Sequence, residues 1–103
     1  MLKIIDGKRY DTETATEVAS YGNGLGGGDF RQFEETLYKT AKGAWFIAGS
    51  GGAMTSYAES VGSGKTSGEG LRPVSANEAM AWLEKYGETD ALDEHFADHI
   101  KDA

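Results

Sequence analysis

Residues 33–40 read FEETLYKT and residues 44–48 read AWFIA, with the tripeptide AKG at 41–43 between them. In the first run apolar and polar residues alternate well enough for a strand, and the second run is almost wholly apolar. β-branched and aromatic residues around a glycine-containing turn favour strands. This pattern predicts an antiparallel hairpin over residues 33–48. Successive side chains of a strand lie on opposite faces, so Trp45 and Ile47 share one face and Phe46 and Ala48 share the other. Because both faces of the second strand are apolar, we expect it to be central and covered on both sides.

The segment before this hairpin predicts a second turn and a short helix. Asp6-Gly7 stands between the short strands expected at 3–5 and 8–10, and Asp-Gly is a strong signal for a two-residue hairpin turn. Thr14-Ala-Thr-Glu17 fits a capping box. Apolar residues then follow at roughly helical spacing, namely Ala15, Val18, Ala19 and Tyr21. We therefore expect a short N-terminal helix that ends at Gly22.

Two further helices are expected after Pro73. Ser75-Ala-Asn-Glu78 is a second capping box, and an apolar stripe follows it at Ala79, Trp82, Leu83 and Tyr86, with Gly87 as the stop. A last helix is expected over residues 90–100, with Leu92, Phe96 and Ile100 on one line. The fold class predicted from these elements is α+β: a small antiparallel β-sheet, a short N-terminal helix, and two C-terminal helices packed on one side. We expect one domain over residues 1–103, with glycine-rich loops at about 22–28 and 49–70.

Composition limits the classes of function. The 103 residues include no cysteine, which excludes a disulfide framework and a thiolate zinc site, and 11% are aromatic, which argues against disorder. No apolar run approaches the ~20 residues that cross a bilayer. The start of the chain lacks the pattern of a secretion signal. We expect a cytoplasmic protein that does not bind membranes.

The charge is concentrated at one end of the chain. The formal net charge is -7, and residues 75–103 hold eight acidic residues against Lys85 and Lys101. Proteins bind phosphate backbones through clustered Lys and Arg, so direct binding of nucleic acid is not expected here. This segment would instead attract a basic protein surface. A solvated acidic helix face that keeps the protein in solution is the alternative interpretation.

Motifs for chemistry are weak. Glu34 and Glu35 are adjacent in a predicted strand, so their side chains point to opposite faces and cannot act on one substrate. His95 and His99 would share a helix face, but two imidazoles without a third ligand make a poor metal site. We therefore assign no catalytic residue, no metal and no cofactor, and we expect that the protein is not an enzyme. A small basic and aromatic surface around the hairpin is the one feature that favours nucleic acid, formed by Arg31, Lys39, Lys42 and Trp45.

The order of several short motifs resembles a family of small acidic proteins carried by phages, plasmids and integrative mobile elements of bacteria. The motifs span nearly the whole chain: Tyr10–Ala15, Gly28–Phe30, Glu34–Thr40, Lys42–Ala58, Gly68–Gly70, Pro73–Ala79 and Trp82–Glu84. The resemblance implies a mobile-element accessory protein in the cytoplasm of a bacterial host. Small acidic proteins in that setting include anti-CRISPR proteins, which bind an effector complex and sometimes occupy its basic groove for DNA.

Two functions are therefore predicted as alternatives. The first is a stoichiometric anti-CRISPR-type inhibitor of a host defence complex, whose partner is a basic protein surface of a CRISPR effector complex. Its expected contacts are the acidic residues Glu84, Glu88, Asp90, Asp93, Glu94 and Asp98. The second is an accessory module that binds nucleic acid or a replication or transfer protein through the hairpin surface around Arg31, Lys39, Lys42 and Trp45.

Overall fold

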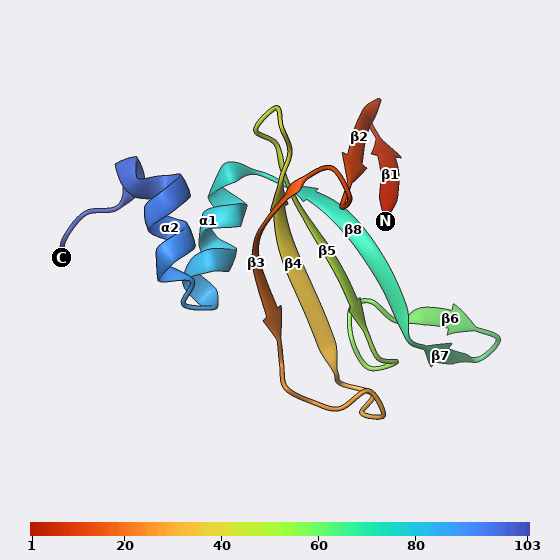
Figure 1. Ribbon diagram of the computed structural model, residues 1–103. Helices are drawn as coiled ribbons and strands as arrows, with labels where there is room; N and C mark the ends of the chain where they lie inside the picture. The colour runs from red at the N-terminus through yellow and green to blue at the C-terminus, as the bar shows by residue number, and fades with distance from the viewer.

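A four-stranded antiparallel sheet with the strand order β3-β4-β5-β8 forms the centre of the molecule (Figure 1). The computed structural model describes residues Met1–Ala103. Two hairpins, β1–β2 and β6–β7, form separate two-stranded sheets, and the helices follow β8. The elements are β1 (Leu2–Ile5), β2 (Lys8–Asp11), β3 (Thr16–Gly22), β4 (Phe33–Lys39), β5 (Trp45–Gly51), β6 (Glu59–Val61), β7 (Gly64–Thr66), β8 (Gly68–Val74), α1 (Ala76–Lys85), α2 (Thr89–Phe96) and the 3-10 turn η1 (Ala97–His99).

The expected hairpin over residues 33–48 is present as β4 and β5, and β5 lies between β4 and β8. Trp45 and Ile47 pack with Leu37 against the helices. On the opposite face Phe46 and Ala48 pack with Tyr10 from the β1–β2 hairpin. The apolar character of both faces of β5 thus follows from its central position with cover on each side.

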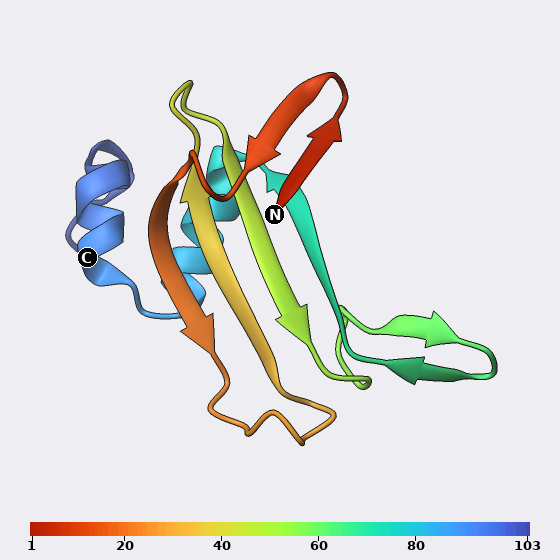
Figure 2. The same cartoon turned by 45° about the vertical axis from the view of Figure 1, so that its right-hand side comes forward.

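Both helices lie on the same face of the sheet, and the β1–β2 hairpin lies over part of the other face (Figure 2). Ala79, Trp82 and Leu83 of α1 are buried there together with Ala91 and Phe96 of α2. Ser75 caps α1 with the expected capping box, because its hydroxyl accepts from the Glu78 amide while the Glu78 carboxylate accepts from the Ser75 amide. Neither helix is long and apolar enough to cross a membrane.

The predicted fold class is wrong, because the chain is mostly β: it forms eight strands in three sheets, and it has no N-terminal helix. Residues Thr16–Gly22 pair with β4 as the strand β3. The register shifts between Glu17 and Ala19, which marks a β-bulge, and both Val18 and Ala19 pack toward the helices. Two consecutive inward residues break the alternation of a strand, so the apolar spacing imitates that of a helix.

Two other boundaries also differ from expectation. Residues 49–70, expected as a loop, contain the end of β5, the β6–β7 hairpin and the start of β8. The last helix was expected to reach Ile100, but α2 ends at Phe96, where φ is -131°, and the chain continues as η1. Ile100 therefore lies outside the helix and is exposed.

Candidate functional site

Four side chains from separate parts of the chain meet at the helix side of the sheet, and we call them the Glu35 cluster. Glu35 lies on β4, Arg72 on β8 and Trp82 on α1, whereas Tyr57 comes from the connection between β5 and β6. The Tyr57 hydroxyl donates to Oε2 of Glu35, and Arg72 Nη1 lies 3.3 Å from the same oxygen. Trp82 Nε1 donates to Oε1 at 3.0 Å. The cluster therefore joins the sheet, the connection and α1 through one carboxylate.

Glycines on the sheet make room for the Tyr57 ring. A Cβ on Gly49 would collide with the Tyr57 hydroxyl and would lie only 2.7 Å from the backbone oxygen of Glu34. At Gly70 a Cβ would lie 3.7 Å from the same ring, which is ordinary contact. Gly49 and Gly70 are directly opposite each other on β5 and β8. The glycine pair thus forms a shallow floor on which the tyrosine lies.

The protonation states follow from burial and from these contacts. Burial by itself would raise the pKa of the Glu35 carboxyl, but hydrogen bonds from Tyr57 and Trp82 and the charge of Arg72 outweigh it and lower that pKa. Burial and the hydrogen bond to Glu35 raise the pKa of Tyr57 to about 12. Near neutral pH the carboxylate is ionised and the phenol is protonated, so neither group is poised to exchange a proton. The cluster is a polar clamp within the fold.

The acidic residues expected to bind a partner lie at the C-terminal end of the fold. On α2, Asp90, Asp93 and Glu94 are exposed, and they share one side of the helix because they are three and four residues apart. Asp98 follows, exposed, on η1. Glu84 is exposed on α1, while Glu88 is half-buried directly before α2. The structure thus places four of the six on the solvent side of α2 and η1.

Of the residues of the alternative hairpin surface, Lys39, Lys42 and Trp45 lie at one end of the β4–β5 hairpin and Arg31 lies at the other. Arg31 precedes β4, whereas Lys39 ends β4 and Lys42 lies in the turn after it, so the length of β4 separates Arg31 from the two lysines. Trp45 is buried, stacks on Phe96 with ring centres 5.1 Å apart, and has the Lys39 ammonium over its ring at 5.1 Å. Its faces are therefore occupied by the protein itself.

The two histidines also have structural surroundings. His95 is half-buried on α2 and meets the Trp45 ring edge-on, with the ring centres 5.5 Å apart. His99 is exposed on η1, beyond the end of α2, so the helix on which the two would share a face does not continue to it. No group of three or more His, Asp or Glu side chains is arranged to hold a metal ion.

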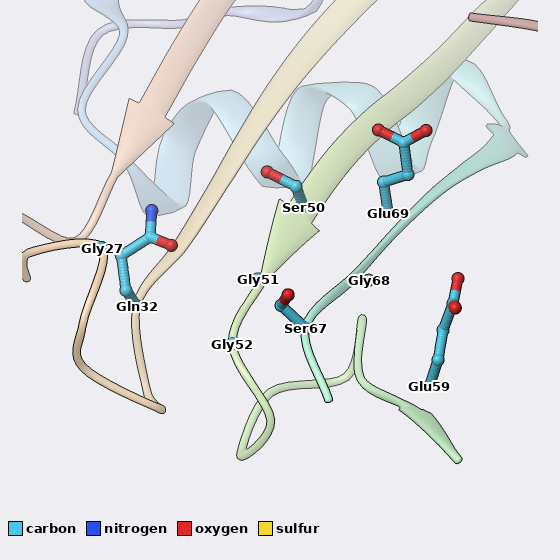
Figure 3. A pocket seen from close by; sticks show the side chains of 9 residues that line it. All are labelled: Gly27, Gln32, Ser50, Gly51, Gly52, Glu59, Ser67, Gly68 and Glu69. Atoms are coloured by element: carbon cyan, nitrogen blue, oxygen red, sulfur yellow. The ribbon is translucent and has the colours of Figure 1, made fainter. Parts of the chain in front are cut away.

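A polar cleft of about 520 Å³ opens at the end of the sheet where β5 ends and β8 begins (Figure 3). Its lining consists of four glycines together with Gln32, Ser50, Glu59, Ser67 and Glu69. Two of the polar residues are acidic and none is basic. A second, smaller cleft of about 290 Å³ shares Ser50 and Glu69 with it and extends along the face opposite the helices.

Comparison with protein-family models, with curated protein sequences and with solved structures finds no match to this chain. The resemblance drawn from the sequence therefore stays a prediction.

The partners of Glu35 and the cleft were not predicted from the sequence. One signal was available, because Glu35 alternates with Phe33 and Leu37 and so lies on the apolar side of its strand. A carboxylate at such a position requires donors when the strand is buried. Which residues donate depends on the pairing of β5 with β8 and on the position of α1, and neither is encoded locally.

Proposed function

We propose that this protein is a stoichiometric inhibitor of a bacterial host defence complex, of the anti-CRISPR type, acting in the cytoplasm of the host. It binds a basic protein surface through the acidic side of α2 and η1. The observation that carries this proposal is the row of exposed carboxylates at Asp90, Asp93, Glu94 and Asp98. No Lys or Arg occurs between Thr89 and Ile100 to neutralise it.

The spacing of these carboxylates supports a basic groove as the partner surface. Asp90 and Glu94 are one helical turn apart, which corresponds to about 6 Å along the axis. Lys and Arg side chains that line a groove for a phosphate backbone bind a row of negative charges, and the exposed carboxylates of α2 present such a row. Like charges at these positions also repel one another within the helix, and opposite charges on a partner would remove that repulsion.

The first test is the plating efficiency of a CRISPR-targeted phage on hosts that express this chain, across several CRISPR types. We expect plating to be restored in one type. The variant D93K/E94K/D98K should lose the effect, because it reverses three charges of the acidic side near the C-terminal end of α2, where lysine is compatible with the helix dipole.

The matched control is E13K/E17K/E34K, which changes the net charge equally at exposed positions away from α2. It should keep the effect, and circular dichroism should show both variants folded. Unchanged plating in every type would refute the proposed inhibitor function. Restored plating that survives D93K/E94K/D98K would refute the assignment to the acidic side of α2.

A further inference from the structure

Two large apolar side chains project from the loops beside the polar cleft. Phe30 is 65% exposed and Met54 is 70% exposed. Phe30 lies in the loop between β3 and β4, and Met54 lies in the connection between β5 and β6. The amide of Met54 donates to the carbonyl of Phe30 at 2.8 Å, so the two residues are neighbours. Exposed aromatic and methionine side chains of this kind are enriched where proteins bind other proteins.

The backbone that carries this apolar pair is held in place. The amide of Gly52 donates to the carbonyl of Gln32 at 2.8 Å, which ties the two loops together a second time. A Cβ on Gly52 would lie 2.6 Å from the carbonyl oxygen of Phe30, so the close approach of the loops requires glycine there. Preorganised apolar groups lose little conformational freedom on binding.

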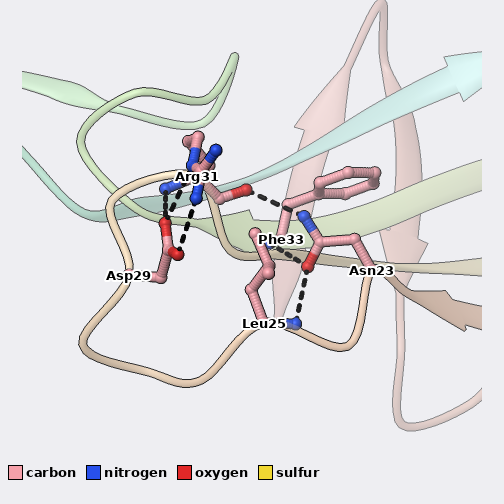
Figure 4. Close-up of polar contacts among 5 residues, drawn as sticks. All are labelled: Asn23, Leu25, Asp29, Arg31 and Phe33. Carbon is pink, nitrogen blue, oxygen red and sulfur yellow. Dashed lines mark hydrogen bonds and ion pairs between the residues drawn. The ribbon is translucent and has the colours of Figure 1, made fainter.

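Polar contacts within the first loop add to this rigidity (Figure 4). The Asn23 side chain donates to the Arg31 carbonyl at 2.8 Å and accepts from the amide of Phe33 at 3.3 Å. Arg31 is paired with Asp29, with Nη2 3.1 Å from Oδ2. The one cation next to Phe30 in the chain is thus already neutralised by its neighbour.

The cleft lies directly beside the apolar pair, because Gly52 and Gln32 line it and also form the contact between the loops. Its charged lining residues are Glu59 and Glu69, both exposed, and neither forms an ion pair within the chain. Glu69 lies with Ser50 on the face opposite the helices, whereas Glu59 packs over Gly68 on the helix side, so the two carboxylates flank opposite faces of β8. A cationic side chain in the cleft would meet the Glu69 carboxylate beside the Ser50 hydroxyl. An anionic lipid surface would be repelled by these carboxylates and by the net charge of -7.

We propose that the cleft and the apolar pair form one docking site for a segment of a partner protein that presents an Arg or Lys beside a large apolar side chain. The cation enters the cleft beside Glu69 and Ser50, Glu59 adds negative charge from the other face of β8, and the apolar side chain packs on Phe30 and Met54. This inference rests on the proposed function, because it gives the basic partner a second contact surface at the end of the sheet.

The probe for this docking site is a library of random dodecapeptides displayed on phage and selected on the immobilised full chain. We expect enriched peptides to combine Arg or Lys with an adjacent Phe, Leu or Met. A synthetic peptide of the enriched sequence should shift the backbone amide resonances of Gly27, Gly52, Met54 and Glu69 in the labelled protein. Those four residues lie in or beside the cleft.

Variants then separate the two halves of the site. F30S/M54S and E59Q/E69Q should each weaken binding of the peptide by about tenfold or more. The control for the apolar half is L2S/I4S, which removes another exposed apolar pair, on β1 (54% and 60% exposed), and should leave binding unchanged. The control for the acidic half is E13Q/E17Q, at exposed positions outside the cleft.

Each other outcome overturns the docking site. Enrichment of purely cationic peptides that shift only α2 resonances would leave the proposed function standing and remove this inference. Peptides that bind F30S/M54S and E59Q/E69Q with the same affinity as the unmodified chain would also remove this inference. If no mixed peptide is enriched, two other assays apply. Binding of the chain to lipid vesicles that is lost in F30S/M54S would assign the apolar pair to a membrane. Self-association that is lost in the same variant would assign it to a second copy of the chain.

Discussion

Removal of the Glu35 carboxylate tests whether the Glu35 cluster holds the sheet, the β5–β6 connection and α1 together. In the variant E35A the indole N–H of the buried Trp82 loses its acceptor, and the Tyr57 hydroxyl loses its own. An unsatisfied buried donor costs about 1–3 kcal/mol, and removal of one member of a buried charged network costs about 3–5 kcal/mol. Arg72 is half-exposed and regains contact with water, which places our expectation near the lower end, at about 3 kcal/mol.

The variant E35Q refines this estimate because it keeps the shape of the side chain. An amide accepts hydrogen bonds on one oxygen only, so either Trp82 or the Tyr57–Arg72 pair must face an NH2 group. We expect a loss of about 2 kcal/mol from one unsatisfied donor and the lost charge. A domain of this size has a free energy of unfolding of about 5–15 kcal/mol, so either loss is easily measured.

The measurement is urea unfolding followed by circular dichroism, with the free energy extrapolated to water. The matched control is E34Q, the adjacent glutamate, whose side chain is exposed on the opposite face of the same strand and should change stability by less than about 0.5 kcal/mol. In addition, W82F should lower the free energy of unfolding less in the E35A variant than in the unmodified chain, because the Trp82 indole N–H already lacks its acceptor in E35A. Equal stability of E35Q and E34Q would refute the reasoning.

Three further predictions concern the same region. The partners of Glu35 lower its pKa below the ordinary 4.5, so the stability that the carboxylate contributes is present above pH 4.5 and is lost as the pH falls through the lowered pKa. The urea midpoint should therefore fall less steeply between pH 6 and 3 for E35Q than for the unmodified chain. Parallel slopes would count against the ion pair. Ultraviolet titration should show one of the five tyrosines ionising with a pKa of about 12, and Y57F should remove that step; since the folded-state pKa is raised, its contribution to stability is lost as the pH rises from 10 to 12. G49A should destabilise the protein by about 1–3 kcal/mol, whereas G28A, where a Cβ meets open space, should not; similar urea midpoints for the two would contradict the role of Gly49 as the floor for Tyr57.

The parts of the fold that the sequence predicts well are those fixed by neighbouring residues. Asp6-Gly7 forms the expected two-residue turn, with φ of +51° and +75°, because Asp and Gly tolerate this conformation without help from distant residues. The capping box of Ser75 is equally local, since donor and acceptor are three residues apart. In both cases the chemistry that selects the conformation lies within one turn of chain.

The failures occur where the structure depends on distant partners. Val18 and Ala19 both face inward only because β3 bulges against β4, and no local pattern marks that bulge. The glycines of residues 49–70 suggested a loop, although Gly49 and Gly51 lie in a strand and are glycines because Tyr57 and Thr55 pack directly over them. A glycine that gives room to a distant side chain cannot be distinguished in the sequence from one that gives the chain freedom.

The Glu35 cluster and the proposed docking site share the connection between β5 and β6, which links the stability of one to binding at the other. Tyr57 anchors this connection to the sheet, and Met54 lies three residues before it on the same short segment. Y57F keeps the ring on its glycine floor but removes the hydroxyl that donates to Glu35. We therefore expect Y57F to weaken binding of the mixed peptide severalfold through a less ordered position of Met54, while E34Q leaves binding unchanged. Isothermal titration with the selected peptide measures both, and unchanged affinity for Y57F would show that the loops hold the apolar pair without the cluster.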